Sequence, residues 1–263
     1  MAIQTLFEPT LQIDKTLRRG DRGEFVTRVQ EWLCFHQFNV GIDGAFGAAT
    51  EQGVADFQAA SGLAVTGDVD PSLFALLTKP MADALRPLVA GASLGQTIAS
   101  CAQQHLLQHP VEIGGQNRGP WVRLYLRGLE RPKDPKLPQG FDAWCAGFAT
   151  SIVDQAATAM HAPAPLGYHT NCNLLAKAAQ KEKRFRRGGE VKPHDIPPGS
   201  LMLIRKRGQK DKWHHTGVVV QALPQVVRTI EGNSANSAEE NPSGHEVCRQ
   251  LRPYGNLDFI VIE

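Results

Sequence analysis

The apolar positions in the first third of the chain recur at the spacing of amphipathic helices. Val26, Val29 and Leu33 share one helical face, and a glycine-containing turn and a second helix follow. A weaker copy of helix, turn and helix comes next, so this part of the chain is an internal quasi-repeat. The pattern predicts a small helical domain over residues 17–80, preceded by a loosely ordered lead-in over residues 1–16.

Hydroxyl side chains, prolines and glycines indicate where these helices begin and end. Thr50 is expected to cap the second helix, and Ser72 is expected to start the last one. Residues 81–94 are typical of a linker, because Pro87 and Gly91 limit any helix there.

Beyond the linker, the pattern changes from helical to strand-like. Helical spacing predicts helices over residues 96–108, 121–126, 143–159 and 171–183. Three prolines in residues 131–139 predict a loop. A Pro-Pro-Gly turn predicts that a strand follows over residues 200–204, and runs rich in β-branched residues predict strands over residues 216–221 and 226–230. The apolar residues 259–262 are expected to form a final strand. Helices followed by an antiparallel sheet indicate an α+β domain over residues 95–263.

Charge and cysteine content narrow the function classes. A formal net charge of +2 predicts no strong attraction to nucleic acid or membranes, and no apolar run is long enough to insert across a bilayer. The five cysteines are widely spaced without a CxxC pair, which favours synthesis in a reducing compartment. The N-terminus lacks a basic segment followed by a long apolar core, so we expect no standard signal peptide.

The N-terminal domain carries a specific set of glycines, apolar and polar residues. The set comprises Leu17, Gly20, Gly23, Val26, Gln30, Leu33, Asp43-Gly44, Phe46-Gly47, Thr50, Val54, Phe57-Gln58 and Gly62-Leu63. With this set the domain resembles the peptidoglycan-binding domain 1 family, which implies a three-helix bundle that binds cell-wall peptide stems or glycan. Most of these residues are expected to shape the bundle, and a wall-contacting surface is expected near the turn of Asp43 and Phe46.

The stretch around Cys145 is a turn followed by an apolar helical pattern. Asp142 is a candidate cap for this helix, and Cys145 falls in its first turn. The free N–H groups and the dipole at a helix N-terminus favour the thiolate, which is the nucleophilic form of cysteine. A buried core cysteine is the commoner alternative, and residues downstream decide between the two.

A predicted hairpin provides those downstream residues. His215 opens one strand, and the next strand ends with Glu231 and Asn233. The turn decides which of these two lies opposite His215, but both project to the same face of the sheet. Either register gives His215 a partner that holds one ring nitrogen while the other faces the nucleophile. The adjacent His214 is expected to point to the opposite face.

Four segments occur in a fixed order along this domain. They are Trp144-Cys145-Ala146-Gly147-Phe148, Pro198-Gly199, His215-Thr216-Gly217-Val218-Val219 and Glu231-Gly232-Asn233. In this order they resemble the CHAP family of cysteine, histidine-dependent amidohydrolases and peptidases, and the loop of residues 112–120 is similar to that family's N-terminal part. The resemblance implies a papain-like scaffold, related to NlpC-type enzymes. The chain departs from the family at Ser200, where an aspartate is common, and in the long basic segment 158–194.

The resemblance implies a role for each matching residue. Cys145 attacks an amide carbonyl, and His215 takes its proton and returns it to the leaving amine. Either Glu231 or Asn233 orients His215; we favour Glu231, with Asn233 supporting it or polarising the substrate. The Cys145 backbone N–H is expected in the oxyanion hole. The candidate substrate-binding side chains are those of Trp144, Asn117, Asp43 and Phe46.

A wall-binding bundle followed by a Cys/His amidohydrolase predicts a peptidoglycan hydrolase. The bond is the muramoyl–L-alanine amide or a peptide bond in the stem or cross-bridge. The protein is expected to be made in the cytoplasm and to reach the periplasm or wall by another route. The two routes that fit are a phage endolysin released through a holin and a type VI secretion effector. An effector would have a cognate immunity protein as its partner.

Two other classes of protein stay open. One is a pure wall-binding protein with an inactive hydrolase domain. The other is a zinc hydrolase that uses Cys145, His214 and His215, although adjacent strand residues point to opposite faces and we expect neither metal nor cofactor. The basic run of residues 181–187 is expected to be a solvated loop, with contact to an anionic wall polymer as the alternative. The cysteines expected to be packing residues are Cys34, Cys101, Cys172 and Cys248.

Overall fold

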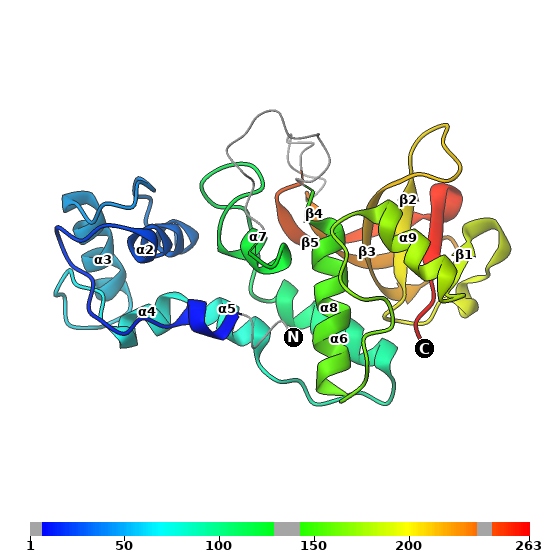
Figure 1. Ribbon diagram of the computed structural model, residues 1–263, viewed down its shortest axis with the longest axis horizontal. Coiled ribbons are helices and arrows are strands. Elements are labelled where there is room, and N and C mark those ends of the chain that lie inside the picture. Colours follow the sequence, from blue (N-terminus) through cyan, green and yellow to red (C-terminus); the bar gives the residue numbers. More distant parts are fainter. Residues whose placement is uncertain (1–6, 129–142, 236–243) are drawn as a thin grey trace.

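The computed structural model describes residues 7–128, 143–235 and 244–263. A group of helices near the N-terminus and a β-sheet with its covering helices lie at opposite ends of the molecule (Figure 1). Helix α5 (Lys79–Leu85), the last of the N-terminal group, and α7 (Pro120–Tyr125) lie where these two parts meet (Figure 1).

The N-terminal part consists of short helices around an apolar core. In chain order they are η1 (Glu8–Leu11), α2 (Glu24–Phe35), α3 (Ala48–Ala60), α4 (Pro71–Leu77) and α5. Val26, Val29 and Leu33 are fully buried on one face of α2, as their spacing predicts. The predicted N-terminal helical domain is therefore confirmed.

Two glutamines show the internal repeat in atomic detail. The Gln30 side-chain oxygen accepts hydrogen bonds from the N–H groups of two consecutive turn residues, beginning with Asp43 (3.0 and 2.8 Å). Gln58 on α3 does the same for the turn that begins with Thr66 (3.0 and 2.9 Å). Each side chain satisfies backbone donors of the turn that follows its helix, so the two turns are fixed in the same way.

The segments before α2 and after α4 are more ordered than predicted. Phe7 and Ile13 are buried, so the described part of the predicted lead-in packs against the domain. Met81 and Leu85 of α5 are also buried, so the first part of the predicted linker is helical. Burying a large apolar side chain contributes about 1.5–3 kcal/mol, which offsets the entropy of ordering these short segments.

Two helix starts also differ from the prediction. Thr50 does not cap α3 but lies inside it, where its buried hydroxyl accepts a hydrogen bond from Gln30 Nε2 (3.1 Å). Asp70 caps α4 in place of Ser72, because its carboxylate accepts a hydrogen bond from the Leu73 N–H (2.7 Å). Aspartate is a strong N-cap, and the proline that follows it is preorganised for the first helical position.

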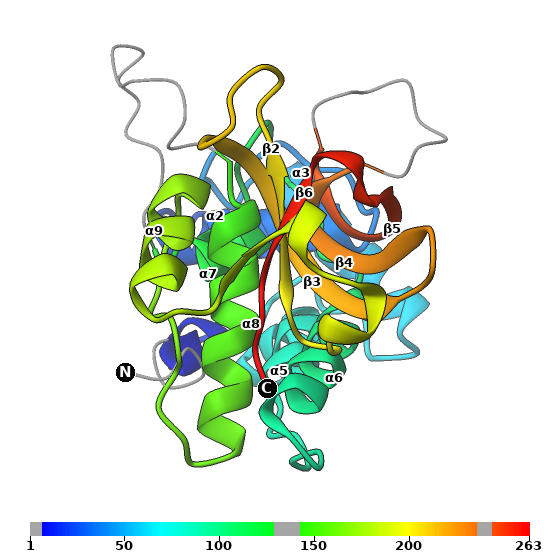
Figure 2. The ribbon, with the colours of Figure 1, turned by 90° about the vertical axis from the view of Figure 1, so that its right-hand side faces the viewer.

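The C-terminal part is a six-stranded antiparallel sheet with helices on one face. The strands are β1 (Phe185–Arg187), β2 (Leu201–Arg205), β3 (Trp213–Ala222), β4 (Val226–Ser234), β5 (Glu246–Pro253) and β6 (Leu257–Ile260). Their order across the sheet is β1-β6-β2-β3-β4-β5. The covering helices are α6 (Leu94–Leu106), α8 (Cys145–Ala159) and α9 (Cys172–Lys181), as Figure 2 shows. The predicted α+β class with an antiparallel sheet is confirmed.

The two edge strands, β1 and β5, were not predicted. Each has one neighbouring strand, and each is rich in charged residues, a common protection for a sheet edge. Their sequences therefore lack the β-branched runs that mark the inner strands. The basic run of residues 181–187 is not simply a solvated loop, because Arg187 lies in β1 and forms an ion pair with the buried Asp258 (3.1 Å).

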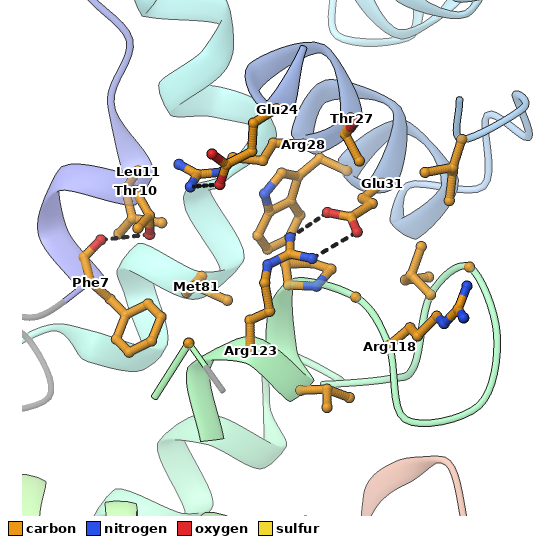
Figure 3. Close-up of a pocket in the computed structure, with 18 of the residues that line it drawn as sticks. Phe7, Thr10, Leu11, Glu24, Thr27, Arg28, Glu31, Met81, Arg118 and Arg123 are labelled. Atoms are coloured by element: carbon orange, nitrogen blue, oxygen red, sulfur yellow. Dashed lines mark hydrogen bonds and ion pairs between the residues drawn. The ribbon is translucent and has the colours of Figure 1, made fainter. Parts of the chain in front are cut away.

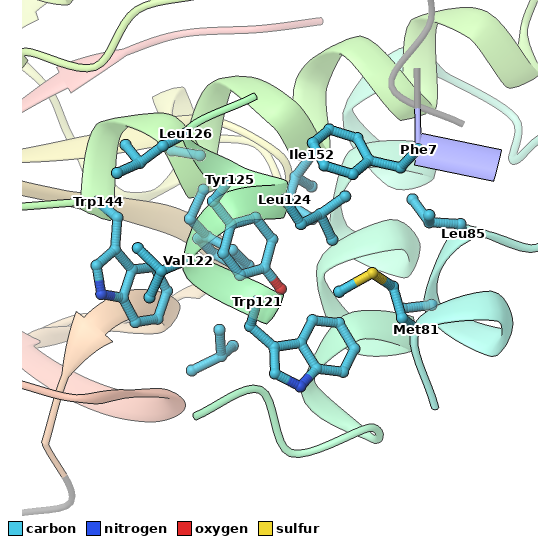
Figure 4. Packing of buried hydrophobic residues seen from close by; sticks show 14 of the residues in the cluster. Phe7, Met81, Leu85, Trp121, Val122, Leu124, Tyr125, Leu126, Trp144 and Ile152 are labelled. Atoms are coloured by element: carbon cyan, nitrogen blue, oxygen red, sulfur yellow. The ribbon is translucent and has the colours of Figure 1, made fainter. Parts of the chain in front are cut away.

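An aromatic cluster joins α7 to the start of α8 (Figure 4). The Tyr125 ring stacks on Trp144, with ring centroids 5.3 Å apart and planes 8° apart. A Cβ on Gly147 would lie 2.4 Å from the Tyr125 carbonyl oxygen, so only glycine permits this approach of α8 to α7. The cluster fixes the first turn of α8, where Cys145 lies.

Candidate active site

Helix α8 begins at Cys145, which places the sulfur at the positive end of the helix dipole. Asp142, the predicted cap, lies outside the described residues, and Trp144 occupies the N-cap position. Helix α8 packs against β3 and β4, the strands that carry the other predicted site residues. Cys145 is only 2% exposed, so burial alone does not distinguish a nucleophile from a core cysteine.

The partners of Cys145 make that distinction. His215 on β3 lies with its Nε2 2.8 Å from Oε2 of Glu231 on β4. The side chains of His215 and Cys145 also shift each other's pKa through a side-chain hydrogen bond and opposite charges, and Nδ1 is the ring nitrogen that Glu231 does not engage. The structure therefore brings together the predicted nucleophile, the predicted base and one of its two predicted partners.

Asn233 takes a different place from the one predicted for it. The paired register of β3 and β4 would set Asn233 opposite His215, but an irregularity in β4 follows Glu231 and Asn233 adopts a φ of 55°. Its side chain turns to α8, where Oδ1 accepts a hydrogen bond from the Trp144 N–H (3.0 Å). Asn233 thus ties β4 to the start of α8, and Glu231 is the one of the two predicted partners that contacts the imidazole.

Two residues of the site were not predicted from the sequence. Arg252 on β5 donates from Nε and Nη2 to the two carboxylate oxygens of Glu231 (2.9 and 2.5 Å). Cys172, the first residue of α9, places its sulfur 3.8 Å from that of Cys145. Neither carries a local signal: β5 was not predicted as a strand, and contact between the starts of two helices depends on tertiary packing.

The charges in the site favour a thiolate–imidazolium pair. The pKa of Cys145 lies well below its ordinary value, because Cys172 donates a hydrogen bond to its sulfur and His215 adds a second hydrogen bond and a positive charge, against the effect of burial. Burial lowers the pKa of His215, but Cys145 and Glu231 outweigh it and raise the pKa to about 10. Burial raises the pKa of Glu231, but Arg252 and His215 bring it to about 2.

Two of the predicted substrate-binding side chains are buried in packing. Trp144 is fully buried, stacks on Tyr125 and donates from Nε1 to Glu112 (2.8 Å). Phe46 is 2% exposed in the core of the helical domain. Both predictions are corrected for the same reason: each aromatic ring fills a core position and presents no free face to a ligand.

The other two predicted wall-contacting side chains, Asp43 and Asn117, differ in exposure. Asp43 is exposed, and its carboxylate accepts hydrogen bonds from the Ala45 N–H and from Gln30 (both 2.8 Å). These bonds, the backbone one first, lower the pKa of Asp43, so the side chain shapes its turn. Asn117 is 9% exposed with a φ of 54° and lines a cavity away from Cys145.

That cavity has a volume of about 790 Å³ and lies between the helical domain and the loop that leads into α7 (Figure 3). Arg28 and Glu31 of α2 line one side, and Asn117 and Arg123 line the other. Arg123 donates from Nη1 to Glu31 across it (2.8 Å). Both the helical domain and the loop that leads into α7 therefore line this cavity.

The zinc alternative needs His214 beside the other two ligands. His214 is exposed, whereas His215 is half-buried against Glu231. Nowhere in residues 7–128, 143–235 and 244–263 do three or more His, Cys, Asp or Glu side chains form a group that could hold a metal ion. Over the same ranges, no helix has the length and apolarity to cross a bilayer.

Comparison with known proteins identifies the N-terminal part of the chain. Residues 22–77 match the family described as putative peptidoglycan binding domain. A solved structure titled "The crystal structure of SleB N-terminal domain" is 32% identical over 26% of this chain and 94% of that chain, with a TM-score of 0.25. No curated protein matches the chain. Residues 22–77, helical in the structure, therefore form a peptidoglycan-binding domain. Through this domain the chain is a cell-wall-associated protein.

Proposed function

We propose that the chain is a peptidoglycan hydrolase that cleaves an amide bond of the wall with Cys145 as its nucleophile. The observation that carries the proposal is the alignment of Cys145, His215 and Glu231, in which a buried carboxylate holds an imidazole against a thiolate. The peptidoglycan-binding domain supplies the substrate class. A helix that begins with the cysteine and packs on an antiparallel sheet supports a papain-like, CHAP-type scaffold for residues 95–263.

The side chains of the site support an acyl-transfer sequence. The Cys145 thiolate attacks the amide carbonyl, and the backbone N–H groups at the start of α8 stabilise the oxyanion. His215 donates its Nδ1 proton to the leaving amine, and a thioester to Cys145 remains. Water, deprotonated by the now neutral His215, attacks the thioester and releases the carboxylate and the thiolate. Glu231 stays ionised throughout and keeps the ring oriented.

The proposal includes the scissile bond and the route by which the protein reaches the wall. The scissile amide is the muramoyl–L-alanine bond or a peptide bond in the stem or cross-bridge. The protein acts in the periplasm or wall after release through a holin, as an endolysin, or after export, as a type VI secretion effector with a cognate immunity protein. The thioester mechanism is the same for each of these.

Turbidity of purified sacculi tests the proposal. The wild-type protein is expected to clear the suspension, and Cys145→Ala is expected to leave it turbid while still pelleting with the sacculi through residues 22–77. Cys34→Ala is the matched control, because Cys34 lies in α2 of the binding domain, and it should clear sacculi like the wild type. Clearing by Cys145→Ala would overturn the nucleophile assignment. Pelleting without clearing by the wild-type protein would leave a pure wall-binding protein.

A further inference from the structure

We infer that Cys145 and Cys172 form a dithiol site for two-electron oxidants such as hydrogen peroxide, which convert it to a disulfide. Only the consequence of the disulfide, the loss of amide hydrolysis, rests on the proposed function. Its structural part concerns two sulfurs that lie 3.8 Å apart in the reduced protein. The sequence predicts Cys172 to be a packing residue, and its sulfur instead contacts the candidate nucleophile.

The two sulfurs are held together by the starts of two helices. Cys145 is the first residue of α8 and Cys172 is the first residue of α9. Asn171 caps α9 by accepting hydrogen bonds from the N–H groups of Asn173 and Leu174. The Asn173 side chain accepts a hydrogen bond from the Trp213 N–H of β3 (2.9 Å). Helix α9 is therefore anchored to the strand that carries the catalytic imidazole, and Cys172 has a fixed position.

The distance is short enough for a bond to form with small movements. A disulfide has a sulfur–sulfur length of about 2.05 Å, so the sulfurs must approach by less than 2 Å from their reduced separation of 3.8 Å. Both residues are buried, at 2% and 6% exposure, and rotation about the two Cα–Cβ bonds moves sulfur without moving either helix. Cys34, in contrast, donates its S–H to the Val40 carbonyl and belongs to no such pair.

The chemistry of the site supports each step. The Cys145 thiolate attacks one peroxide oxygen, the O–O bond breaks, and the departing hydroxide takes a proton from the His215 imidazolium to become water. This leaves a sulfenic acid on Cys145. The Cys172 sulfur attacks the sulfenic sulfur, the S–O bond breaks, and the hydroxyl leaves with the thiol proton as a second water. One peroxide is reduced to two waters and two thiols are oxidised to one disulfide.

The disulfide has two consequences for the proposed enzyme. It removes the nucleophile, so hydrolysis stops, and it protects the Cys145 sulfur from irreversible oxidation to the sulfinic acid. Reduction is favourable because the departing Cys145 thiolate is stabilised by His215 and by the dipole of α8, and a stabilised thiolate is a good leaving group. The site is therefore a reversible one, opened by dithiols.

Non-reducing peptide mapping after peroxide treatment tests the inference in the full chain. The expected product is a cross-linked peptide pair containing Cys145 and Cys172, with an intact mass lower by two hydrogen atoms. Sacculus clearing is expected to fall at least tenfold and to return with dithiothreitol. In Cys172→Ser, peroxide is expected to add two or three oxygen atoms to Cys145, giving the sulfinic or sulfonic acid, and the lost activity is not expected to return with dithiothreitol. Cys34→Ser should oxidise and recover like the wild type.

The possible results separate this inference from the proposed function. Oxygen addition to Cys145 in the wild-type protein without a Cys145–Cys172 cross-link, or a cross-link to another cysteine, overturns the inference even if sacculi are cleared. The cross-link in a protein that never clears sacculi upholds the dithiol site and sinks the proposed function. Circular dichroism checks that Cys172→Ser is folded. If it is not, Cys172→Ala is used in its place, with the same expected addition of oxygen to Cys145.

Discussion

The protonation states of three side chains are linked by contacts rather than by burial. Burial opposes the charge on Cys145, His215 and Glu231 alike, yet hydrogen bonds and opposite charges win at each one. A thiol and an imidazole that exchanged their proton only in the transition state would show ordinary pKa values. The opposite shifts here instead predict an ion pair in the resting protein, as in reactive cysteines beside a histidine.

Iodoacetamide alkylation against pH measures this ion pair. Because the pKa of Cys145 is well below 9, alkylation of Cys145 is expected to stay fast at neutral and mildly acidic pH. Cys145 and Glu231 together raise the pKa of His215 to about 10. Glu231→Gln removes the charge of Glu231, so the imidazolium is expected to deprotonate at a lower pH, nearer to its ordinary value of 6.5. A Cys145 that alkylates only near pH 9 in the wild-type protein would contradict the ion pair.

Arg252 is the second residue-scale test. Arg252→Gln leaves the fully buried Glu231 carboxylate with weaker donors, and loss of a charged partner is expected to lower the free energy of unfolding by about 3 kcal/mol at neutral pH. The pKa of folded Glu231 is about 2 against 4.5 unfolded, so its contribution is present above pH 4.5 and is lost as pH falls towards 2. The variant should lose it at higher pH.

Urea unfolding at several pH values measures this effect. Arg249→Gln is the matched control, because Arg249 lies on the same strand and, among its described side-chain partners, makes one exposed hydrogen bond to Gln103. The control is expected to unfold like the wild type. Equal urea midpoints for Arg252→Gln and Arg249→Gln at neutral pH would remove Arg252 from the site.

At the scale of elements, the site depends on the close packing of β3 against β4 beside α8. Gly217, two residues after His215, faces Glu231, and a Cβ added there would lie 2.5 Å from the Glu231 Cγ. Glu231 is held by His215 and Arg252 and has no free direction in which to move. The glycine of the predicted His-Thr-Gly-Val pattern therefore makes room for the residue that orients the imidazole.

Gly217→Ala is expected to displace Glu231 and misalign His215. The rate of sacculus clearing should fall about 10–100-fold, since small displacements of a catalytic group have effects of this size, and overpacking should cost about 1–3 kcal/mol of stability. Gly189→Ala is the control, because a Cβ there meets no atom within 4 Å. Clearing at the wild-type rate by Gly217→Ala, measured at a temperature where it is folded, would show that the alignment is not needed.

The sequence predicts these elements unevenly, for physical reasons. The helices that become α6, α8 and α9 were predicted from helical spacing within a few residues of their ends. The inner strands β3 and β4 were predicted from β-branched runs, and β2 and β6 from apolar runs, whereas β1 and β5 were missed because an edge strand buries fewer apolar side chains. Cys145, His215 and Glu231 could be predicted from motif order. Arg252 and Cys172 could not, because only the folded chain brings them to the site.

At the scale of the whole molecule, the wall-binding domain and the candidate catalytic domain are in contact. Glu31 of α2 pairs with Arg123 of α7, and both side chains are largely buried, at 7% and 21% exposure. The rings of Trp32 and Trp121 meet edge to face beside them, with centroids 6.1 Å apart. Such a contact predicts that the two domains unfold together and hold one orientation on the wall.

Glu31→Gln tests this coupling. Loss of the buried charge is expected to cost about 1–3 kcal/mol and to separate one thermal transition into two in a calorimetric scan. Pelleting with sacculi should be unchanged, because residues 22–77 keep their own core. Glu51→Gln is the control, since its pair with Arg19 is within the domain and exposed and contributes little. A single transition at the wild-type temperature in Glu31→Gln would mean that the contact does not couple the domains.

Mass spectrometry of muropeptides tests the central claim most directly. After digestion of purified sacculi, the wild-type protein is expected to produce fragments whose masses sum to that of the parent muropeptide plus one water, with a new amine on one fragment. Cys145→Ala, incubated in the same way, is expected to produce none of them. Identical product profiles for the two proteins, or products cut only at glycosidic bonds, would contradict an amide hydrolase that uses Cys145.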